Sequence, residues 1–478
     1  MDLDWQVCSR ARLSRDARFD GKFFVGVLTT GIYCRPVCRA PTAMEKNVRY
    51  FASAAAAAEA GLRPCLRCRP ECAPGTPAWS GTRSTVSRAL KLISESGLEE
   101  GGVEALAQHL GVGSRHLRRL FLQHLGASPR AVAETRRLHF AKKLIDETRL
   151  PMGEVAVAAG FGCVRRFNAG IRKAYQRTPT QIRRLARQKT LQPENQYLFR
   201  LRFRAPYNWN SLLSFLTARI VPGVEAAGED FYRRSISVNG GFGYFEVSPD
   251  PLNDALLVRV QIGDPRSLFF ITERIRALFD LNADWSVIAR TLKTDAMLAR
   301  AVENNPGLRV PGCWNGFELT VRAILAQQVS APAAVALAGT LVRLCGMPAA
   351  VADGLTHIFP DPKALAEADL AAAGLPPSRA HTIGSLARAV CDGRLRFEGI
   401  VDAGEFLGRL KEIPGIAEWT LQYVAMRALG EPDAFPSLAN SRELERRAET
   451  WRPWRAYAAM CLWDLAARGK PVGIRNLA

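Results

Sequence analysis

Cys34-Arg35-Pro36-Val37-Cys38 and Cys65-Leu66-Arg67-Cys68 are two close cysteine pairs near the start of the chain. Pairs at this spacing, separated by a stretch long enough to fold back (39–64), are how a small domain surrounds a tetrahedral metal ion. Zinc suits four thiolates, and its binding supplies folding free energy that a domain of about 70 residues with little core otherwise lacks. Spacing alone indicates a structural zinc site, and the alternative is that one zinc-bound thiolate is also a nucleophile.

The residues around the pairs favour the nucleophile. The stretches TTGIYCRPVCR (29–39) and GLRPCLRC (61–68) resemble the N-terminal zinc domain of the Ada family of DNA alkylation-response proteins, over about residues 5–72. In that family the first cysteine of the cluster takes a methyl group irreversibly from a methylated DNA phosphate. The resemblance implies that Cys34 is the methyl acceptor and that one zinc ion is bound by Cys34, Cys38, Cys65 and Cys68.

Length and charge limit the number of domains in the chain and the kind of partner that it binds. At 478 residues, three or four domains are expected, and the net charge of +20 favours an anionic partner. Nucleic acid is the first candidate for that partner and an anionic membrane surface the second. No run approaches 18 apolar residues and the start has no signal-peptide pattern, so we expect a soluble cytoplasmic protein. The other cysteines are scattered singly, as buried thiols of a reducing compartment are.

A repeated helical pattern fills about residues 84–188. Each repeat has a short helix, a glycine-containing turn and a basic amphipathic helix, which is the helix-turn-helix pattern. Plain helical hairpins are the alternative. The predicted helices are Val103–Leu110 with Ser114–His124, and Met152–Ala159 with Cys163–Tyr175, and the matching positions are Leu117, Phe121, Ser128 and Pro129 with Phe167, Ile171, Thr178 and Pro179.

Charge favours DNA binding by these repeats. Between Arg115 and Lys189 there are 18 Lys/Arg residues against four Asp/Glu residues. The whole segment resembles the AraC/XylS DNA-binding region, in which two such helices enter successive major grooves. Ser114 is expected to cap the first basic helix. The residues expected to contact DNA are Arg115, Arg118, Arg165 and Arg166.

A small α+β region is expected at about 195–285. Tyr197–Phe203 alternates apolar and polar residues, as a half-buried strand does. Gly240 and Gly241 are turn residues. No catalytic signature is found here. Further predicted elements are strands at Ile236–Val238, Tyr244–Val247 and Leu256–Ile262, and a helix at Trp209–Ile220.

Helices are expected again after about residue 286. Leu410–Tyr423 reads as helix, Pro-Gly hairpin and helix, which turns backbone N–H groups toward a phosphate. This stretch resembles the helix-hairpin-helix of DNA glycosylases, and the hairpin contacts would come from Pro414, Gly415 and Ile416. Residues 195–478 together resemble the bacterial inducible 3-methyladenine-DNA glycosylase family. Supporting stretches include Pro206–Trp209, Leu308–Gly312, Gln327–Ser330 and Arg452–Ala458.

That second resemblance implies a site for alkylated bases. The family flips the damaged base out of the duplex and cuts its glycosidic bond. An aromatic pocket suits this task because alkylated purines are cationic and stack on rings. Gln328 occupies the position of the residue that enters the vacated space in the duplex. The matching pocket residues are Trp419, Tyr423 and Trp463, which would otherwise be interpreted as helix core.

One expected catalytic group is missing. In this family an aspartate, a few residues after a motif matching Asp433–Pro436, stabilises the positive charge that develops on the sugar. By register that position is Ala439, and the stretch up to Trp451 is about ten residues shorter than the family's, which suggests a deletion. Asp433 and Glu443 are the nearest acids, and neither is in register.

The sequence therefore predicts a mainly α, multidomain protein. Its expected parts are an Ada-like zinc domain (1–78), a tandem helix-turn-helix (79–190), a small α+β domain (191–285) and an all-α helix-hairpin-helix glycosylase domain (286–478). Duplex DNA, methylated DNA and RNA polymerase are the expected partners, with no membrane, and the chain is expected to act as a monomer. One alternative is a methylation-activated regulator whose glycosylase-like domain is inactive. Another is an ordinary regulator with a structural zinc site.

Overall fold

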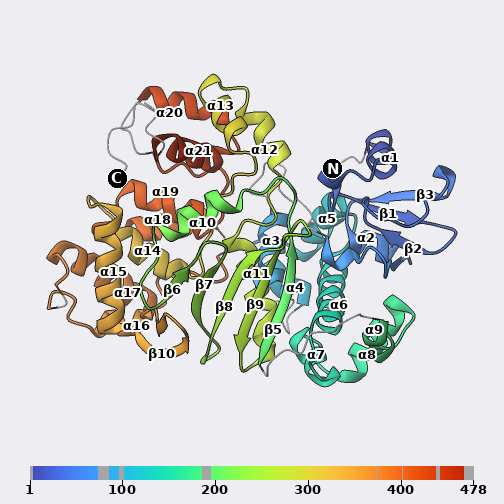
Figure 1. Cartoon of the computed structure of the whole chain (residues 1–478), viewed down its shortest axis with the longest axis horizontal. Coiled ribbons are helices and arrows are strands. Elements are labelled where there is room, and N and C mark those ends of the chain that lie inside the picture. Colours follow the sequence, from blue (N-terminus) through green and yellow to red (C-terminus); the bar gives the residue numbers. More distant parts are fainter. Residues whose placement is uncertain are drawn as a thin grey trace. The chain divides into compact units, whose positions relative to one another are not determined.

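The computed structural model describes residues 4–73, 85–95, 102–185, 195–372, 374–400, 402–437 and 442–467. The chain divides into two compact units (Figure 1). The first comprises residues 1–205, 250–273 and 281–283, and the second comprises residues 206–249, 274–280 and 284–478. The four expected domain boundaries stay a prediction, because this division interleaves the two units between residues 206 and 283.

The first unit begins with helix α1 (Trp5–Leu13), whose N-terminus is capped by the side chain of Asp4. A four-stranded sheet in the order β3-β1-β2-β4 follows. Helix α2 (Ala54–Glu59) lies in an alanine-rich stretch, and its N-cap is Ser53, whose hydroxyl oxygen accepts from the N–H of Ala56. The strands are β1 (Phe24–Val27), β2 (Ile32–Cys34), β3 (Val48–Phe51) and β4 (Arg63–Pro64).

The tandem helix-turn-helix is confirmed. Leu117, Phe121, Phe167 and Ile171 are all fully buried, so the repeated apolar positions form equivalent cores. The expected cap at Ser114 is wrong: Gly113 is the N-cap and Ser114 is already the first helical residue. The helices are α3 (Thr85–Glu95), α4 (Gly102–His109), α5 (Ser114–Leu125), α6 (Pro129–Glu147), α7 (Met152–Ala158), α8 (Val164–Tyr175) and α9 (Pro179–Leu185).

The predicted strands of the 195–285 region are present. In the first unit, β5 (Gln196–Arg202) pairs antiparallel with β9 (Ala255–Ile262), and β5 alternates buried and more exposed residues as expected. In the second unit, β7 (Tyr232–Val238) pairs antiparallel with β6 (Glu225–Ala227) and runs beside β8 (Gly241–Pro249). Helix α10 (Trp209–Thr217) ends three residues earlier than expected.

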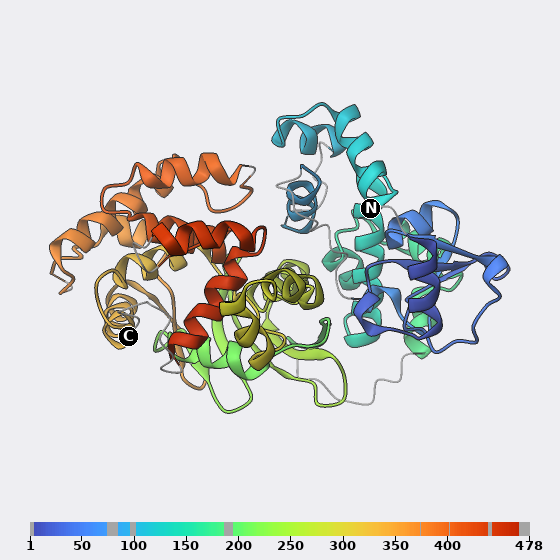
Figure 2. The same ribbon diagram turned by 90° about the horizontal axis from the view of Figure 1, so that it is seen from above.

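The remainder of the second unit is helical, as expected, apart from a two-stranded antiparallel ribbon. The sequence did not suggest β10 (Met347–Ala352) and β11 (Leu355–Ile358), because β10 is rich in alanine and contains Pro348. Figure 2 shows these helices gathered together in yellow to red. They are α12 (Trp285–Leu292), α13 (Ala296–Asn304), α14 (Gly316–Leu325), α15 (Ala331–Cys345), α16 (Pro362–Glu367), α17 (Pro377–Cys391), α18 (Ala403–Lys411), α19 (Glu418–Arg427), α20 (Arg442–Ala448) and α21 (Arg455–Ala467), with α11 (Leu268–Leu278) before them.

The core of these helices holds the hairpin helices in place. Val321, Ile324, Leu386, Leu410 and Val424 belong to one buried apolar cluster, contributed by α14, α17, α18 and α19. Burying such side chains stabilises the fold by about 1.5–3 kcal/mol each. Among the residues that the structure describes, no helix is both long and apolar enough to cross a lipid bilayer.

Candidate zinc centre and candidate base pocket

The four predicted zinc ligands converge in the first unit. Strands β2 and β4 run parallel, with Tyr33 opposite Pro64, so Cys34 at the end of β2 lies beside the start of the second cysteine pair. The sulfur atoms of all four cysteines lie within 4.8 Å of one another. Four thiols at this separation match the tetrahedral donor set that Zn²⁺ prefers, and the site fits one zinc ion.

Hydrogen bonds and charge also suit thiolate sulfur. The N–H of Arg35 donates to Sγ of Cys68 at 3.3 Å, and the N–H of Ala40 donates to Sγ of Cys38 at 3.4 Å. Zinc with four thiolates carries a formal charge of about −2. Arg35 is buried beside the cluster, donates to the Cys68 carbonyl at 3.1 Å and pairs with Asp20 at 2.8 Å.

Exposure does not single out one cysteine. Cys65 is buried, whereas Cys34, Cys38 and Cys68 are partly exposed. The choice of Cys34 as methyl acceptor therefore stays a prediction.

Metal removal is expected to unfold the zinc domain. One buried apolar cluster of this domain comprises Cys8, Ala11, Phe23, Val25 and Val48, and a domain of about 70 residues buries little core. A structural zinc ion contributes apparent binding free energies of about 10 kcal/mol or more, so a strong chelator should abolish hydrogen-exchange protection in β1–β3. The second unit serves as the control, because it should keep its protection. Full protection of β1–β3 after metal loss would contradict this expectation.

A buried network of charged side chains ties the zinc domain to helix α6. Lys142 Nζ lies 3.4 Å from Oε1 of Glu71 and 2.5 Å from Oδ2 of Asp146. Arg69, next to Cys68, contacts the same two acids at 3.1 and 2.9 Å. The hydroxyl of Tyr33, next to Cys34, lies 3.0 Å from Nε2 of His139. Residues flanking the zinc ligands therefore contact the helix that joins the two helix-turn-helix units.

His139 should make the stability of the first unit depend on pH. Burial lowers the pKa of its imidazole from 6.5 to about 4. Between these values the unfolded chain binds more protons than the folded chain. This stabilising contribution is therefore complete above about pH 6.5 and is lost as pH falls through 4. We expect a loss of about 2 kcal/mol, discounted for partial exposure of the ring.

The matched variant for this expectation is His139→Gln, which keeps a hydrogen-bonding group near Tyr33 but cannot titrate. Urea unfolding of both proteins between pH 7.5 and pH 5 gives the measurement. Proton uptake by the zinc cysteines is common to both, so it cancels in the difference. Equal pH slopes for the two proteins would show that His139 does not carry the effect.

The arginines predicted to bind DNA lie on exposed faces. Arg115, Arg165 and Arg166 are exposed in the first turns of α5 and α8. Arg118 is exposed too, but its Nη2 donates to Oε1 of Glu104 at 2.7 Å, so DNA would have to compete with that ion pair. Their contacts with DNA stay a prediction.

The predicted wedge and hairpin lie together in the second unit. Gln328 is exposed and has a left-handed backbone (φ 55°), which a side chain other than glycine rarely adopts. Its neighbour Gln327 donates to the Gly415 carbonyl at 3.2 Å and to the Thr420 hydroxyl at 3.1 Å. Gly415 (φ 89°) tolerates no side chain, because a Cβ there would lie 2.1 Å from Oγ1 of Thr382. Pro414 is exposed and Ile416 partly exposed at the same turn.

The predicted aromatic pocket is assembled from α19 and α21. Trp419 and Tyr423 stack with ring centroids 4.7 Å apart, and Tyr423 lies 6.3 Å from Trp463. Phe215 on α10, which the sequence analysis did not select, stacks against Trp463 at 6.3 Å. Among the described residues, Nε1 of Trp419 is buried without a hydrogen-bond partner. An indole N–H in this state is available to a ligand.

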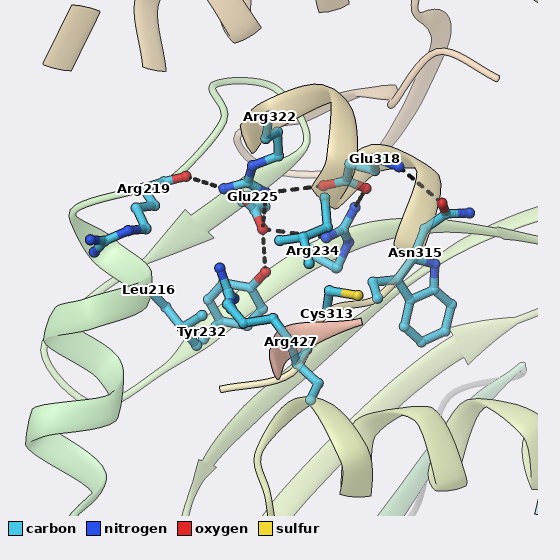
Figure 3. A pocket seen from close by; sticks show the side chains of 13 residues that line it. Leu216, Arg219, Glu225, Tyr232, Arg234, Cys313, Asn315, Glu318, Arg322 and Arg427 are labelled. Atoms are coloured by element: carbon cyan, nitrogen blue, oxygen red, sulfur yellow. Dashed lines mark hydrogen bonds and ion pairs between the residues drawn. The ribbon is translucent and has the colours of Figure 1, made fainter. Parts of the chain in front are cut away.

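Arg427, which contacts the Tyr423 ring, also belongs to a buried cluster of charges (Figure 3). Arg234 and Arg322 pair with Glu225 and Glu318, at distances from 2.5 to 3.3 Å. Burial alone would raise the pKa of Glu225, but Arg322 and Arg234 lower it to about 2. Arg219 and Arg427 line the same cavity, whose volume is about 20 Å³.

The nearest acids are engaged elsewhere. Asp433 accepts from Nε of Arg455 at 2.8 Å and also pairs with Arg452. Glu443 is exposed and pairs with Arg446. Ala439, the position expected to carry the family's aspartate, lies outside the described residues. The two acids nearest in sequence are therefore both paired with arginines.

Together, a four-cysteine zinc domain, a tandem helix-turn-helix and a helix-hairpin-helix glycosylase fold define a fused DNA alkylation-response protein. Three family models match the chain: the metal binding domain of Ada at residues 7–71, a helix-turn-helix domain at 106–185 and the AlkA N-terminal domain at 198–315. The chain is 39% identical to the probable bifunctional transcriptional activator/DNA repair enzyme AlkA of Mycobacterium tuberculosis, over 97% of each chain. It belongs to the family of that bifunctional protein.

Two further similarities concern the glycosylase part. DNA-3-methyladenine glycosylase 2 of Escherichia coli is 32% identical over 56% of this chain and 96% of its own length. The structure of a 3-methyladenine DNA-glycosylase from Archaeoglobus fulgidus superposes with a TM-score of 0.50 and 20% identity, covering 57% of this chain and all of that one. At that identity the second similarity supports the fold alone.

Proposed function

We propose that this chain repairs methylated DNA phosphates, regulates transcription in response, and removes alkylated bases. The observation that carries the proposal is the convergence of Cys34, Cys38, Cys65 and Cys68 in the domain that matches the metal binding domain of Ada. The M. tuberculosis relative, named as an activator and repair enzyme, supports the same combination.

In the first reaction the sulfur of Cys34 attacks the methyl carbon of a phosphotriester. The C–O bond breaks, the phosphate regains its negative charge, and the sulfur becomes a thioether. Zinc bound to the four thiols keeps them deprotonated at neutral pH. Loss of one thiolate charge also weakens repulsion from DNA phosphates, so methylation should tighten specific DNA binding.

In the second reaction a damaged base flips into the pocket formed by Trp419, Tyr423 and Trp463, and water cleaves its glycosidic bond. Gln328 would fill the vacated space, while Pro414, Gly415 and Ile416 would hold a phosphate. A regulator with an inactive glycosylase domain is the second candidate function, and the missing acid at Ala439 favours it.

RNA polymerase is the proposed partner for activation, and two recognition helices in one chain favour a monomer on an asymmetric site. Because DNA is the partner, we place the protein in the cytoplasm. The test gives purified protein two duplexes, one with a methylphosphotriester and one with 3-methyladenine. A methylated protein peptide and released base are expected. A methylated peptide without base release would establish the second candidate, and the absence of both products would refute the proposal.

A further inference from the structure

Two guanidinium groups lie against the aromatic pocket. Nη1 of Arg427 donates to the hydroxyl of Tyr423 at 2.6 Å, and its Cζ lies 5.3 Å from the centre of that ring and 5.0 Å from that of Phe215. Cζ of Arg219 lies 3.9 Å from the Phe215 ring. Two rings of the pocket wall therefore already contact protein cations.

These two arginines differ from the other two in the cavity. The remaining contacts of Arg427 are to the carbonyls of Pro311 and Gly312, both at 2.8 Å, and Nη1 of Arg219 donates to the Phe215 carbonyl at 3.0 Å. Within the described residues, neither forms a salt bridge with a carboxylate. Since Arg234 and Arg322 are balanced by Glu225 and Glu318, the cavity wall has an excess of two positive charges (Figure 3).

Base release moves negative charge onto the base, and the excess positive charge of the cavity wall favours this movement. When the C1′–N bond breaks, its electron pair goes to the base and positive charge develops on the sugar. Water then adds its oxygen to C1′. The attacking water loses a proton as its oxygen bonds to C1′. When the substrate is a cationic alkylated purine, the base leaves neutral and this proton goes to solvent. When the substrate is a neutral purine, the leaving base takes up this proton. In both cases the base becomes more negative in the transition state than in the bound substrate.

We propose that Arg427 and Arg219 are positioning residues that hold an electropositive field on the leaving-group side of the base pocket, acting through Tyr423 and Phe215. Such a field stabilises the transition state more than the bound substrate, which is the condition for catalysis. The inference rests on the proposed base release. It places electrostatic assistance on the base, whereas the missing aspartate would have acted on the sugar.

The state of Tyr423 agrees with this field. Burial alone would raise the pKa of its phenol, but Arg427 and Arg219 lower it below its ordinary value. Because the Tyr423 oxygen accepts from Arg427, its own proton remains available for an acceptor atom of the base. An acidified phenol is the stronger hydrogen-bond donor toward a base that is gaining electron density.

The test uses the full chain and Arg219→Met, because Arg219 is only partly buried and its side chain donates to the Phe215 carbonyl four residues earlier in the chain. Binding of two free ligands is followed by tryptophan fluorescence: the purine cation 7,9-dimethylguaninium and neutral hypoxanthine. Removing one positive charge should tighten binding of the cation by about tenfold and leave hypoxanthine unchanged. Single-turnover release of 7-methylguanine from duplex DNA should slow by about tenfold.

Arg219→Lys is the rescue variant, since it keeps the charge at this position and should keep most of the discrimination against the cation. Unchanged or weaker cation binding by Arg219→Met would overturn the inference. If neither the natural chain nor the variant releases a base, the proposed glycosylase activity fails. The binding measurement still tests whether the arginines make the pocket electropositive, because it requires no cleavage.

Discussion

Replacing Cys34 with serine is expected to abolish methyl transfer from a DNA methylphosphotriester, lowering the rate by a factor of 10³ or more. A serine hydroxyl stays protonated at neutral pH and cannot attack the methyl carbon as a thiolate does. The measurement is the mass of the peptide containing residue 34 after incubation with methylated duplex, together with zinc content.

Cys38→Ser is the matched control, because both residues are partly exposed zinc ligands of the same pair. It should weaken zinc binding to a similar degree yet still yield a methylated Cys34. A methylated Cys34→Ser protein together with an inert Cys38→Ser protein would assign the acceptor to Cys38. Loss of transfer in both variants, with zinc also lost from both, would mean that four ligands are required before any thiol reacts.

Replacing Ala439 with aspartate is expected to accelerate base release by about 10²–10³-fold, because a carboxylate beside the sugar stabilises its developing positive charge. Duplex binding should stay within about threefold, since the substitution adds a transition-state interaction. Single-turnover release of 3-methyladenine from a defined duplex gives the rate. Ser437→Asp controls for added negative charge two residues away and should produce no comparable gain.

A natural chain that already releases base as fast as Ala439→Asp would contradict this expectation. The base pocket with alanine at position 439, together with Arg219 and Arg427, would then be sufficient for base release. If neither protein releases base, the shortened stretch before Trp451 has removed more than one side chain. The protein would then function as a sensor and regulator.

Local sequence signals predicted much of this architecture. The cysteine spacing identified a cluster whose sulfurs do converge, and the repeated positions Leu117 and Phe167 are buried as equivalents. The cap at Ser114 was wrong because Gly113 already provides the extended backbone that precedes the helix. The ribbon of β10 and β11 was missed because alanine does not signal a strand.

The groups behind the base pocket could not be found in this way. Phe215 on α10 and Arg219 just after it meet Arg427 on α19 only after the chain has folded, and the sequence of one segment does not predict its contact with the other. Arg427 in a helix beside apolar residues reads as an ordinary surface cation. Its hydrogen bond to Tyr423 joins residues four apart in one helix, but its burial depends on long-range contacts such as those with the Pro311 and Gly312 carbonyls.

The network of Glu71, Lys142 and Asp146 has a consequence for inheritance. A zinc domain taken from another lineage would bring its own residue at position 71, and the resident Lys142 on α6 would lose one of its two buried acidic partners. Exchange by recombination within residues 74–84 is therefore disfavoured, although that stretch looks like a natural joint in the sequence. The methyl acceptor and the DNA-reading helices are expected to pass together from ancestor to descendant as one heritable block.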